Sequence, residues 1–250
     1  MRLLLIEDTT QLAGPIAREL HSEYGHRVTC VRDPLEAREL DEQFDLAVVD
    51  LLYEHLSRPF DQLRLARQVS LTRDRLLITG LTAVKDLSKR SPSTKIVLWS
   101  SGEANRRLHL QYAYEDLRIR AYCSKSSGTG RADVLNTAIT AAANGQDYVD
   151  SVLSPYLPYR RKQTISSTLF RESARRAIWA AVALGAHTRS EISDVTGYST
   201  RTIGGHIPGM VDDLVVLDQG ITPGARPINE IVRYASQNWE FFLDDALKLQ

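Results

Sequence analysis

Three continuous apolar runs in the first half of the chain constrain its fold more than any other feature. They occupy residues 3–6, 46–49 and 96–99, and two weaker runs lie at 28–31 and 121–123. Apolar runs that do not alternate with polar residues indicate strands buried on both faces. Helical patterns separate them, at residues 11–24, 34–43, 81–89, 106–117 and 131–144. The alternation predicts an α/β domain with a parallel sheet between helices, and five such units fit the flavodoxin-like strand order.

The composition is that of a globular protein. The chain has 250 residues, of which 43% are hydrophobic and 25% charged, enough for two small domains. No apolar run approaches the roughly 18 to 20 residues of a membrane span, and the N-terminus lacks a signal-peptide pattern. We therefore expect a cytoplasmic protein with no membrane partner. Cys30 and Cys123 have no Cys or His at metal-ligand spacing, so neither a disulfide framework nor a zinc site is expected.

Charge is balanced over the whole chain but not in its last third. The formal net charge is zero, which argues against non-specific coating of nucleic acid. Residues 160–211 hold eight Lys and Arg against three Asp and Glu, whereas residues 212–250 hold three against seven. One face of this region could therefore be basic.

Polar residues follow the expected strands, where ligands of a parallel sheet bind. They are Glu7, Asp8, Asp50, Ser100 and Lys125. Converging carboxylates repel one another unless a cation neutralises them, and hard oxygen ligands suit Mg²⁺. A lysine and a hydroxyl opposite would hold the remaining oxygens of a phosphoryl group, with an Asp as nucleophile. Each residue alone is equally well explained as a polar strand end, but all five together predict a phosphoryl-transfer site.

Residues 1 to 150 resemble the receiver domain of bacterial response regulators. The matching stretches are LLLIED, FDLAVVD, KIVLWSSGE and AYCSKSS. The resemblance implies a phosphoacceptor, a switch hydroxyl, an aromatic switch residue and an invariant-type lysine, which are Asp50, Ser100, Tyr122 and Lys125. It implies a Mg²⁺ site formed by Glu7, Asp8, Asp50 and the backbone carbonyl of Leu52. It also implies a sensor histidine kinase or a small phosphodonor as partner.

The segment after Asp50 departs from the receiver pattern. Glu54 stands where the family usually has proline, and the usual helix opening appears only at Gly80. The extra segment, about residues 53–79, is longer than expected by about 20 residues and exceeds common loop lengths. It contains an amphipathic stretch at residues 60–69. Two interpretations remain open: the segment gates access to Asp50, or it decorates the surface.

A junction follows the receiver-like domain, which we place at residues 1–148. Residues 136–157 predict a helix ended by Gly145 and then a small second helix. Two prolines and a basic cluster at residues 160–162 mark a linker, residues 149–166. The stretch TAITAAANGQDYVDSVLSPYL is similar to the receiver-to-linker junction of the NarL/LuxR-type response regulators.

The second domain, residues 167–250, is expected to be all-α. Helical patterns cover residues 169–184 and 188–196, and the second has a capping box formed by Thr188 and Glu191. Gly197 ends it, and Ser199 caps a third helix, which gives a helix-turn-helix whose last helix enters the DNA major groove. The stretch HTRSEISDVTGYSTRTIGGHIPGMVDDL resembles the four-helix LuxR-type DNA-binding domain.

The third helix also departs from its family. Gly204 and Pro208 stand where basic residues are usual, so we predict that this helix is short or kinked near Pro208. The candidate DNA contacts are Arg189, Ser199, Arg201, Thr202 and His206, with Arg175 and Arg176 near enough in sequence to reach phosphates. Arg201 and His206 are equally well explained as a solvated and a packed residue. So few cations predict weak monomer binding and a homodimer on DNA.

The C-terminal residues 227–247 keep apolar positions at helical spacing. They either complete the core of the second domain or, through Trp239, Phe241 and Phe242, form a dimer seam.

The sequence thus predicts a two-component response regulator, a DNA-binding transcription regulator and not an enzyme, controlled by phosphorylation of Asp50. The alternatives are a phosphorylation-independent regulator governed by the extra segment or another ligand, a protein-binding adaptor, and a Mg²⁺-dependent phosphohydrolase. The last is disfavoured because Leu52 occupies the place of the second acid-base carboxylate.

Overall fold

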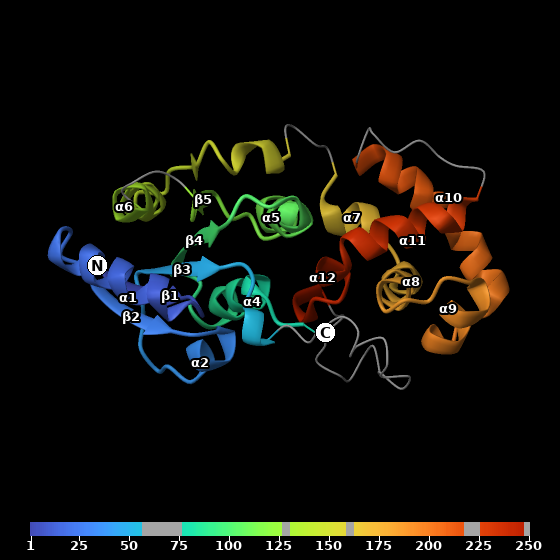
Figure 1. Cartoon of the computed structure of the whole chain (residues 1–250), viewed down its shortest axis with the longest axis horizontal. Coiled ribbons are helices and arrows are strands. Elements are labelled where there is room, and N and C mark those ends of the chain that lie inside the picture. The colour runs from blue at the N-terminus through green and yellow to red at the C-terminus, as the bar shows by residue number, and fades with distance from the viewer. Residues whose placement is uncertain (57–76, 127–130, 159–162, 218–225, 248–250) are drawn as a thin grey trace. The chain divides into compact units, whose positions relative to one another are not determined.

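The computed structural model describes residues 1–56, 77–126, 131–158, 163–217 and 226–247, and these form two compact units (Figure 1). The first unit contains the described residues up to 56 and those from Ile78 to 158. The second contains Leu77 and the described residues from 163 onward. Most of the extra segment, residues 57–76 with the amphipathic stretch 60–69, lies outside the described residues.

A parallel sheet forms the centre of the first unit. Its strands are β1 (Arg2–Ile6), β2 (Arg27–Val31), β3 (Leu46–Asp50), β4 (Lys95–Ser100), β5 (Ala121–Ser124) and β6 (Tyr148–Val149). The strand order is β2-β1-β3-β4-β5-β6, and every neighbouring pair is parallel. The first five strands have the predicted flavodoxin-like order, which is therefore confirmed. Strand β3 is buried throughout, as its continuous apolar run predicted.

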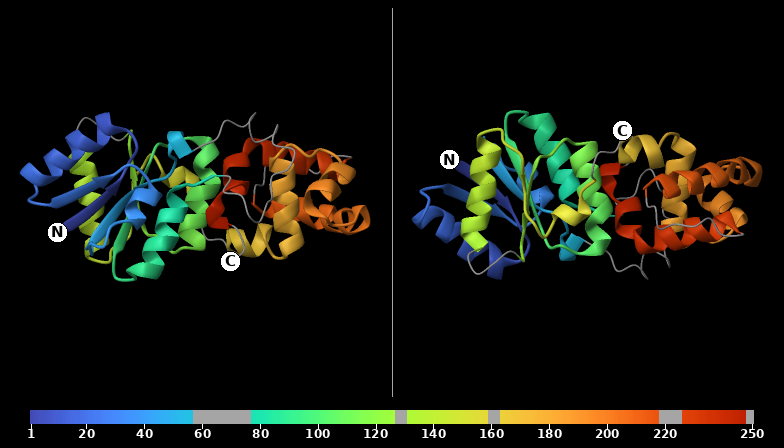
Figure 2. Two further views of the ribbon diagram at one scale, coloured as in Figure 1. Left: turned by 90° about the horizontal axis from the view of Figure 1, so that it is seen from below. Right: turned by 90° about the horizontal axis from the view of Figure 1, so that it is seen from above.

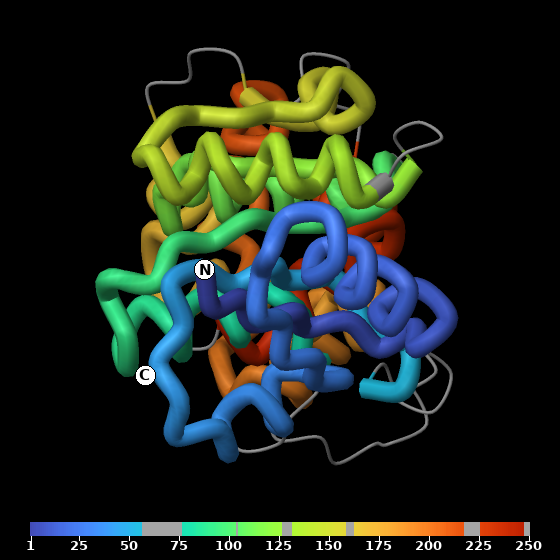
Figure 3. The backbone as a smooth tube through the Cα atoms, turned by 90° about the vertical axis from the view of Figure 1, so that its left-hand side faces the viewer, coloured from blue at the N-terminus to red at the C-terminus, as the bar shows by residue number. Residues whose placement is uncertain are grey.

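Helices cover both faces of the sheet. They are α1 (Thr10–Ser22), α2 (Pro34–Arg38), α4 (Gly80–Arg90), α5 (Arg107–Glu115) and α6 (Arg131–Ala143). Helices α1 and α6 lie on one side, where their apolar residues and those of β1, β3, β4 and β5 form one core (Figures 2 and 3). Helices α4 and α5 lie on the other side (Figure 2).

Two predictions for this unit need correction. Helix α2 ends at Arg38 and not at residue 43, because residues 41–43 are exposed and the chain turns inward at Phe44 to begin β3. Gly145, with φ of 71°, ends the turn after α6, but the chain then adds the edge strand β6 before a short 3-10 helix, η3 (Ser154–Tyr156). The Tyr148 N–H donates to the Arg120 carbonyl and the Asp150 N–H to the Tyr122 carbonyl, and a helix at this place would leave these bonds along β5 unmade.

The second unit is all-helical, as predicted. Its helices are α7 (Ile165–Leu169), α8 (Ser173–Ala183), α9 (Arg189–Thr196), α10 (Thr200–Leu217), α11 (Pro227–Gln237) and α12 (Trp239–Phe242), followed by the 3-10 helix η4 (Asp245–Leu247). The short helices α7 and α12 come in addition to the four that were expected. Within the described ranges, no helix combines the length and the apolar character that crossing a membrane requires.

Helix α10 contradicts the prediction of a short third helix. It runs for 18 residues through Pro208 to Leu217. Proline removes one helical hydrogen bond and costs about 3 kcal/mol. The apolar residues that α10 buries at helical spacing offset this cost, and they are Ile203, Ile207, Met210, Val211, Leu214 and Leu217.

Aromatic side chains form the core between α8 and the C-terminal helices. The Trp179 ring stacks on Phe242 with ring centroids 4.6 Å apart, and Phe170 lies 5.9 Å from Phe241. Phe241 and Phe242 are both buried. Of the two interpretations of this tail, the structure therefore supports core packing for these two residues.

Candidate functional site

Charged residues meet at the carboxyl edge of the sheet, as the parallel strands require. Asp50 ends β3, Glu7 follows β1, and Lys125 follows β5. The Nζ atom of Lys125 lies 2.6 Å from Oε2 of Glu7 and 2.8 Å from Oδ1 of Asp50. This convergence was predicted from the sequence, and the structure brings the three residues into contact.

Asp50 is nearly inaccessible, with 2% of its surface exposed. Burial raises the pKa of its carboxyl group to about 7. The Lys125 charge lowers this pKa, and the nearby Glu7 carboxylate raises it further. Its Oδ1 atom accepts the Leu51 backbone N–H at 2.7 Å as well as the Lys125 contact, so these contacts leave Oδ2 available. A cation bound beside Asp50 would favour its ionised form.

Three carboxylates are suited to a divalent cation. One carboxylate oxygen from each of Glu7, Asp8 and Asp50 can be chosen so that all three lie within 4.8 Å of one another. Carboxylate oxygens are hard donors of the kind that Mg²⁺ prefers, and among the described residues the buried Glu7 and Asp50 side chains share one ion-pair partner, Lys125. The residues therefore fit Mg²⁺, while the contribution of the Leu52 carbonyl stays a prediction.

The loop after β3 closes on Asp8. The Glu54 backbone N–H donates to Oδ2 of Asp8 at 2.8 Å, and Nδ1 of His55 lies 3.5 Å from the same oxygen. The other ring nitrogen of His55 lies 2.8 Å from Oδ2 of Asp33. Glu54 thus reaches Asp8 through its backbone. His55 was not predicted as a site residue, because its only signal in the sequence is its place five residues after Asp50.

The start of α4 packs directly against the backbone of Asp50. The Gly80 N–H donates to the Leu51 carbonyl at 2.9 Å, and the Tyr53 hydroxyl donates to the Asp50 carbonyl at 2.9 Å. A Cβ at position 80 would overlap the Asp50 carbonyl oxygen. Just before this turn, the Leu77 carbonyl accepts the Asp245 N–H at 2.8 Å.

The predicted switch residues lie at the ends of β4 and β5. Ser100 accepts a hydrogen bond from Nη1 of Arg106 at 3.4 Å and donates to the Ser101 carbonyl at 3.3 Å. Tyr122 is fully buried, and burial raises the pKa of its hydroxyl well above the ordinary value. Arg106 was not predicted as a site residue, because its approach to Ser100 depends on the path of the loop between β4 and α5.

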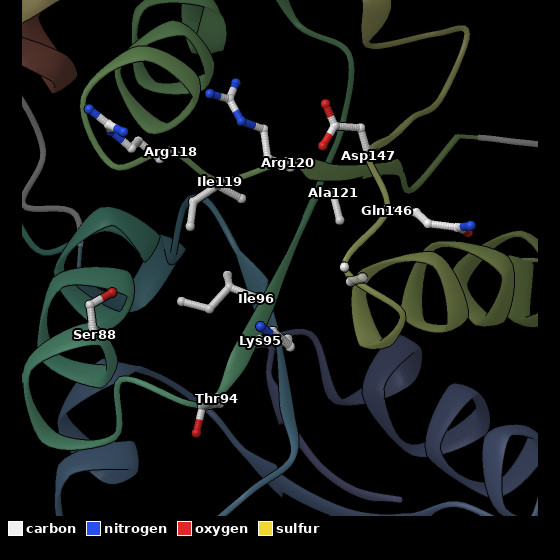
Figure 4. Close-up of a pocket in the computed structure, with 12 residues that line it drawn as sticks. Ser88, Thr94, Lys95, Ile96, Arg118, Ile119, Arg120, Ala121, Gln146 and Asp147 are labelled. Carbon is white, nitrogen blue, oxygen red and sulfur yellow. The ribbon is translucent and has the colours of Figure 1, made fainter.

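A pocket of about 290 Å³ lies at the opposite edge of the sheet, where β4 and β5 begin (Figure 4). Lys95 and Arg120 line it, but the Arg120 guanidinium points away from Lys95 and stacks 4.3 Å from the centre of the Tyr114 ring. We assign no ligand to this pocket.

In the second unit, α9 and α10 form the predicted helix-turn-helix. The capping box is present: Oγ1 of Thr188 accepts the Glu191 N–H at 3.2 Å, and Glu191 accepts the Thr188 N–H at 3.0 Å. Gly197 adopts φ of 75°, in the left-handed region that favours glycine, and ends α9. Oγ of Ser199 accepts the Thr202 N–H at 3.1 Å at the start of α10.

The candidate DNA contacts differ in exposure. Arg189, Ser199, Arg201 and Thr202 are exposed, whereas the His206 side chain is only 18% exposed and lies 3.7 Å from Glu172. Arg189 of α9 lies over Gly204 of α10. A Cβ added at Gly204 would be 3.2 Å from Nη1 of Arg189. The arginine that crosses this glycine therefore brings a cation to α10 from the neighbouring helix.

Two arginines that were expected near phosphates are used inside the unit. Arg175 pairs with Asp213, and Arg176 donates to the Leu247 carbonyl and lies 5.0 Å from the centre of the Phe170 ring. These contacts direct both guanidinium groups into the helical unit, against the expectation that they reach DNA.

No protein-family model and no curated protein sequence matches this chain. Its fold is similar to that of the Salmonella typhimurium RcsB response regulator, at 19% sequence identity and a TM-score of 0.50, covering 92% of this chain and 98% of that chain. A structure of two RcsB dimers bound to two parallel DNAs gives 16% identity and a TM-score of 0.53, covering 95% of this chain and 98% of that chain. RcsB from Salmonella enterica serovar Typhimurium, bound to promoter rprA in the presence of the phosphomimetic BeF3⁻, gives 16% identity and a TM-score of 0.51 at the same coverage. The chain therefore has the two-part fold of these response regulators, a receiver-type α/β unit followed by an all-helical unit.

Proposed function

We propose that this protein is a DNA-binding transcription regulator, active as a homodimer, whose DNA affinity is controlled by phosphorylation of Asp50. The observation that carries the proposal is the contact of Lys125 with both Glu7 and Asp50 at the carboxyl edge of the sheet, on a chain that also holds a helix-turn-helix. The RcsB structures support it, since one contains dimers on DNA and another contains a promoter and a phosphomimetic.

In this proposal, Asp50 accepts a phosphoryl group from a sensor histidine kinase or a small acyl phosphate. Its Oδ2 atom attacks phosphorus in line with the leaving group, which departs with the electrons of the broken bond to phosphorus. The Leu51 N–H and Lys125 hold Oδ1 during the attack. Glu7, Asp8, Asp50 and the Leu52 carbonyl would hold Mg²⁺, which offsets the charge of the phosphoryl oxygens. Lys125 then leaves Glu7 to pair with one of those oxygens.

Two hydrogen bonds connect the predicted switch residues with the segment that leads out of the first unit. The Tyr156 hydroxyl donates to the Gly102 carbonyl at 2.8 Å, two residues after Ser100. The Asp150 N–H donates to the Tyr122 carbonyl at 2.9 Å. If Ser100 rotates toward the phosphoryl group, the movement is transmitted through these two hydrogen bonds to residues 150–156. In this way a local change of charge shifts the conformation of a larger element.

For DNA, the exposed start of α10 enters the major groove. Arg201 and Thr202 face base edges there, and Arg189 and Ser199 approach from the preceding turn, with His206 one turn further along. Because phosphate contacts supply much of the affinity, this small number of cations requires a dimer on a two-fold site.

The phosphorylation step is tested by incubating the protein with Mg²⁺ and an acyl phosphate and measuring its intact mass. The wild type is expected to gain one phosphoryl group, and Asp50→Asn none. Asp41→Asn changes an exposed aspartate away from the site and serves as the matched control. A wild type that gains no phosphoryl group from either a kinase or an acyl phosphate would refute this step.

The DNA step is tested by selecting a binding sequence from random duplexes and measuring its affinity. Arg201→Ala is expected to lose about 1 to 3 kcal/mol of binding free energy. Arg233→Ala removes an exposed arginine that pairs with Glu230 on α11, and should bind normally. Equal affinities for both variants would show that α10 does not carry the contact.

A second candidate function is a regulator that works without phosphate. The closed loop at Asp8 favours it, because the Glu54 N–H and His55 already contact one oxygen of a carboxylate that the Mg²⁺ site would use. DNA binding that persists unchanged in the presence of Mg²⁺ and beryllofluoride would support this alternative.

A further inference from the structure

A second cation, Arg106, lies inside the candidate phosphorylation site. Its side chain is 15% exposed, and Nη1 donates to Oγ of Ser100 at 3.4 Å. Its charge also reaches the phosphoacceptor, where it acts with Lys125 against the effect of burial on the Asp50 pKa. The site therefore contains one more positive group than the sequence pattern indicated.

The chemistry of the guanidinium group fixes the role of the Ser100 hydroxyl. Arginine carries N–H donors and no acceptor, so Ser100 must offer it a lone pair and direct its own proton elsewhere. That proton now points to the Ser101 carbonyl at 3.3 Å. Both contacts of Ser100 are at the long end of the hydrogen-bond range. An anionic phosphoryl oxygen on Asp50 would be a stronger acceptor than the carbonyl.

Helix stability does not explain an arginine at this place. Arg106 directly precedes α5 as its N-terminal cap residue and makes no side-chain capping bond, and a cation at a helix N-terminus is disfavoured by the helix dipole. Its carboxylate partner is Glu103, with Nε 3.3 Å from Oε2, and the Glu103 side chain is 56% exposed. A pair whose carboxylate is this exposed to solvent is weak. The guanidinium can therefore change partner when an anion arrives.

We propose that Arg106 is a positioning residue for the phosphoryl group on Asp50. It holds the Ser100 hydroxyl as a donor toward a phosphoryl oxygen and adds a second positive charge, after Lys125, beside the phosphoryl group. The inference rests on the proposed phosphorylation of Asp50 and deepens it.

The test is a titration of the full chain with beryllofluoride at saturating Mg²⁺, together with a titration with Mg²⁺ alone. Tryptophan fluorescence reports both, because Trp99, one of the three tryptophans of the chain, is buried with its ring centre 5.4 Å from Nζ of Lys125. Arg106→Gln is expected to weaken beryllofluoride binding about tenfold, the loss typical of a charge-assisted hydrogen bond. Its Mg²⁺ affinity should be unchanged or higher, because a repelling cation is gone.

Two further variants sharpen the result. Arg106→Lys keeps the charge and a donor and should recover part of the affinity. Arg107→Gln removes the exposed neighbouring arginine and should behave as the wild type. If Arg106 acts through Ser100, the loss caused by Arg106→Gln should shrink in a Ser100→Ala background, which a double-mutant cycle measures.

Each contrary result has a distinct meaning. Normal beryllofluoride affinity in Arg106→Gln would overturn the inference, and so would a loss that is equal with and without Ser100. A parallel loss of Mg²⁺ affinity would mean structural damage and would also overturn it. A wild type that does not bind beryllofluoride would instead refute the proposed phosphorylation itself, and the inference would fall with it.

Discussion

Gly80 provides a sharp test of how the site is built, because its missing side chain lets α4 begin against the phosphoacceptor strand. An alanine Cβ would lie 3.1 Å from both the Asp50 carbonyl carbon and the Leu51 Cα, and would overlap the Asp50 carbonyl oxygen. These are backbone atoms, which cannot swing aside as a side chain can. Restoring a contact distance of about 3.3 Å to that oxygen requires α4 to move by about 1 Å.

The cost of Gly80→Ala follows from what that movement breaks. The Gly80 N–H to Leu51 carbonyl bond contributes about 1 kcal/mol, and overpacking of this kind costs about 1 to 3 kcal/mol. Replacing glycine by alanine also stabilises by about 0.4 to 1 kcal/mol through the unfolded chain. The net expectation is about 1 to 3.5 kcal/mol of lost stability, with slower phosphorylation of Asp50.

Gly14→Ala is the matched control. Gly14 lies inside α1, and an added Cβ would meet Arg18 at 3.7 Å, an ordinary contact. The unfolded-state gain is the same in both variants, so Gly14→Ala should stabilise by about 0.5 to 1 kcal/mol. Hydrogen exchange in peptides from β1 and β3 measures the free energy of unfolding of this unit. A Gly80→Ala protein as stable as Gly14→Ala would refute the close packing of α4 on Asp50.

Three more predictions concern stability. Burial lowers the pKa of His109 to about 3, whereas its pKa in the unfolded chain is about 6.5. Below pH 6.5 the unfolded state therefore binds one more proton than the folded state, and the free energy of unfolding falls by about 1.4 kcal/mol for each unit by which the pH is lowered. His109→Gln should flatten this loss between pH 6.5 and 5 in denaturant titrations, and an unchanged slope would contradict the assignment. Asp213→Ala removes the buried carboxylate that pairs with both Arg171 and Arg175 and leaves Arg175 with its longer contact to the exposed Glu172. It should cost about 3 kcal/mol, whereas the exposed Asp212→Ala should cost little in the same titration. Thr188→Ala removes the α9 cap and should cost about 1 kcal/mol, and no loss would mean that the capping box is not formed in solution.

Sequence patterns predicted the sheet well because its strands are apolar on both faces. They failed where an element is short or set by its surroundings. Strand β6 has two residues, too few for any periodicity, and it forms because β5 offers free backbone groups. The expected single C-terminal helix divides at Asn238, which separates α11 from α12. Helix α10 is longer than predicted. The free energy gained by burying its apolar face exceeds the cost of the glycines and the proline, from which an early end was predicted.

The candidate site divides in the same way. Glu7, Asp50 and Lys125 follow strands of a parallel sheet, so their meeting follows from topology and was predictable. Arg106 and His55 reach the site from loops whose paths depend on tertiary packing. The sequence alone marks them only as a basic residue and a histidine.

A phosphoryl group on Asp50 is proposed to change the affinity of the protein for DNA. This effect is tested most directly by fluorescence anisotropy of a selected DNA duplex titrated with the wild type and with Asp50→Asn, each with and without Mg²⁺ and beryllofluoride. The wild type is expected to bind about tenfold more tightly with beryllofluoride, a coupling of about 1.4 kcal/mol, and the variant is expected not to respond. Equal DNA affinity of the wild type in both conditions would contradict the claim.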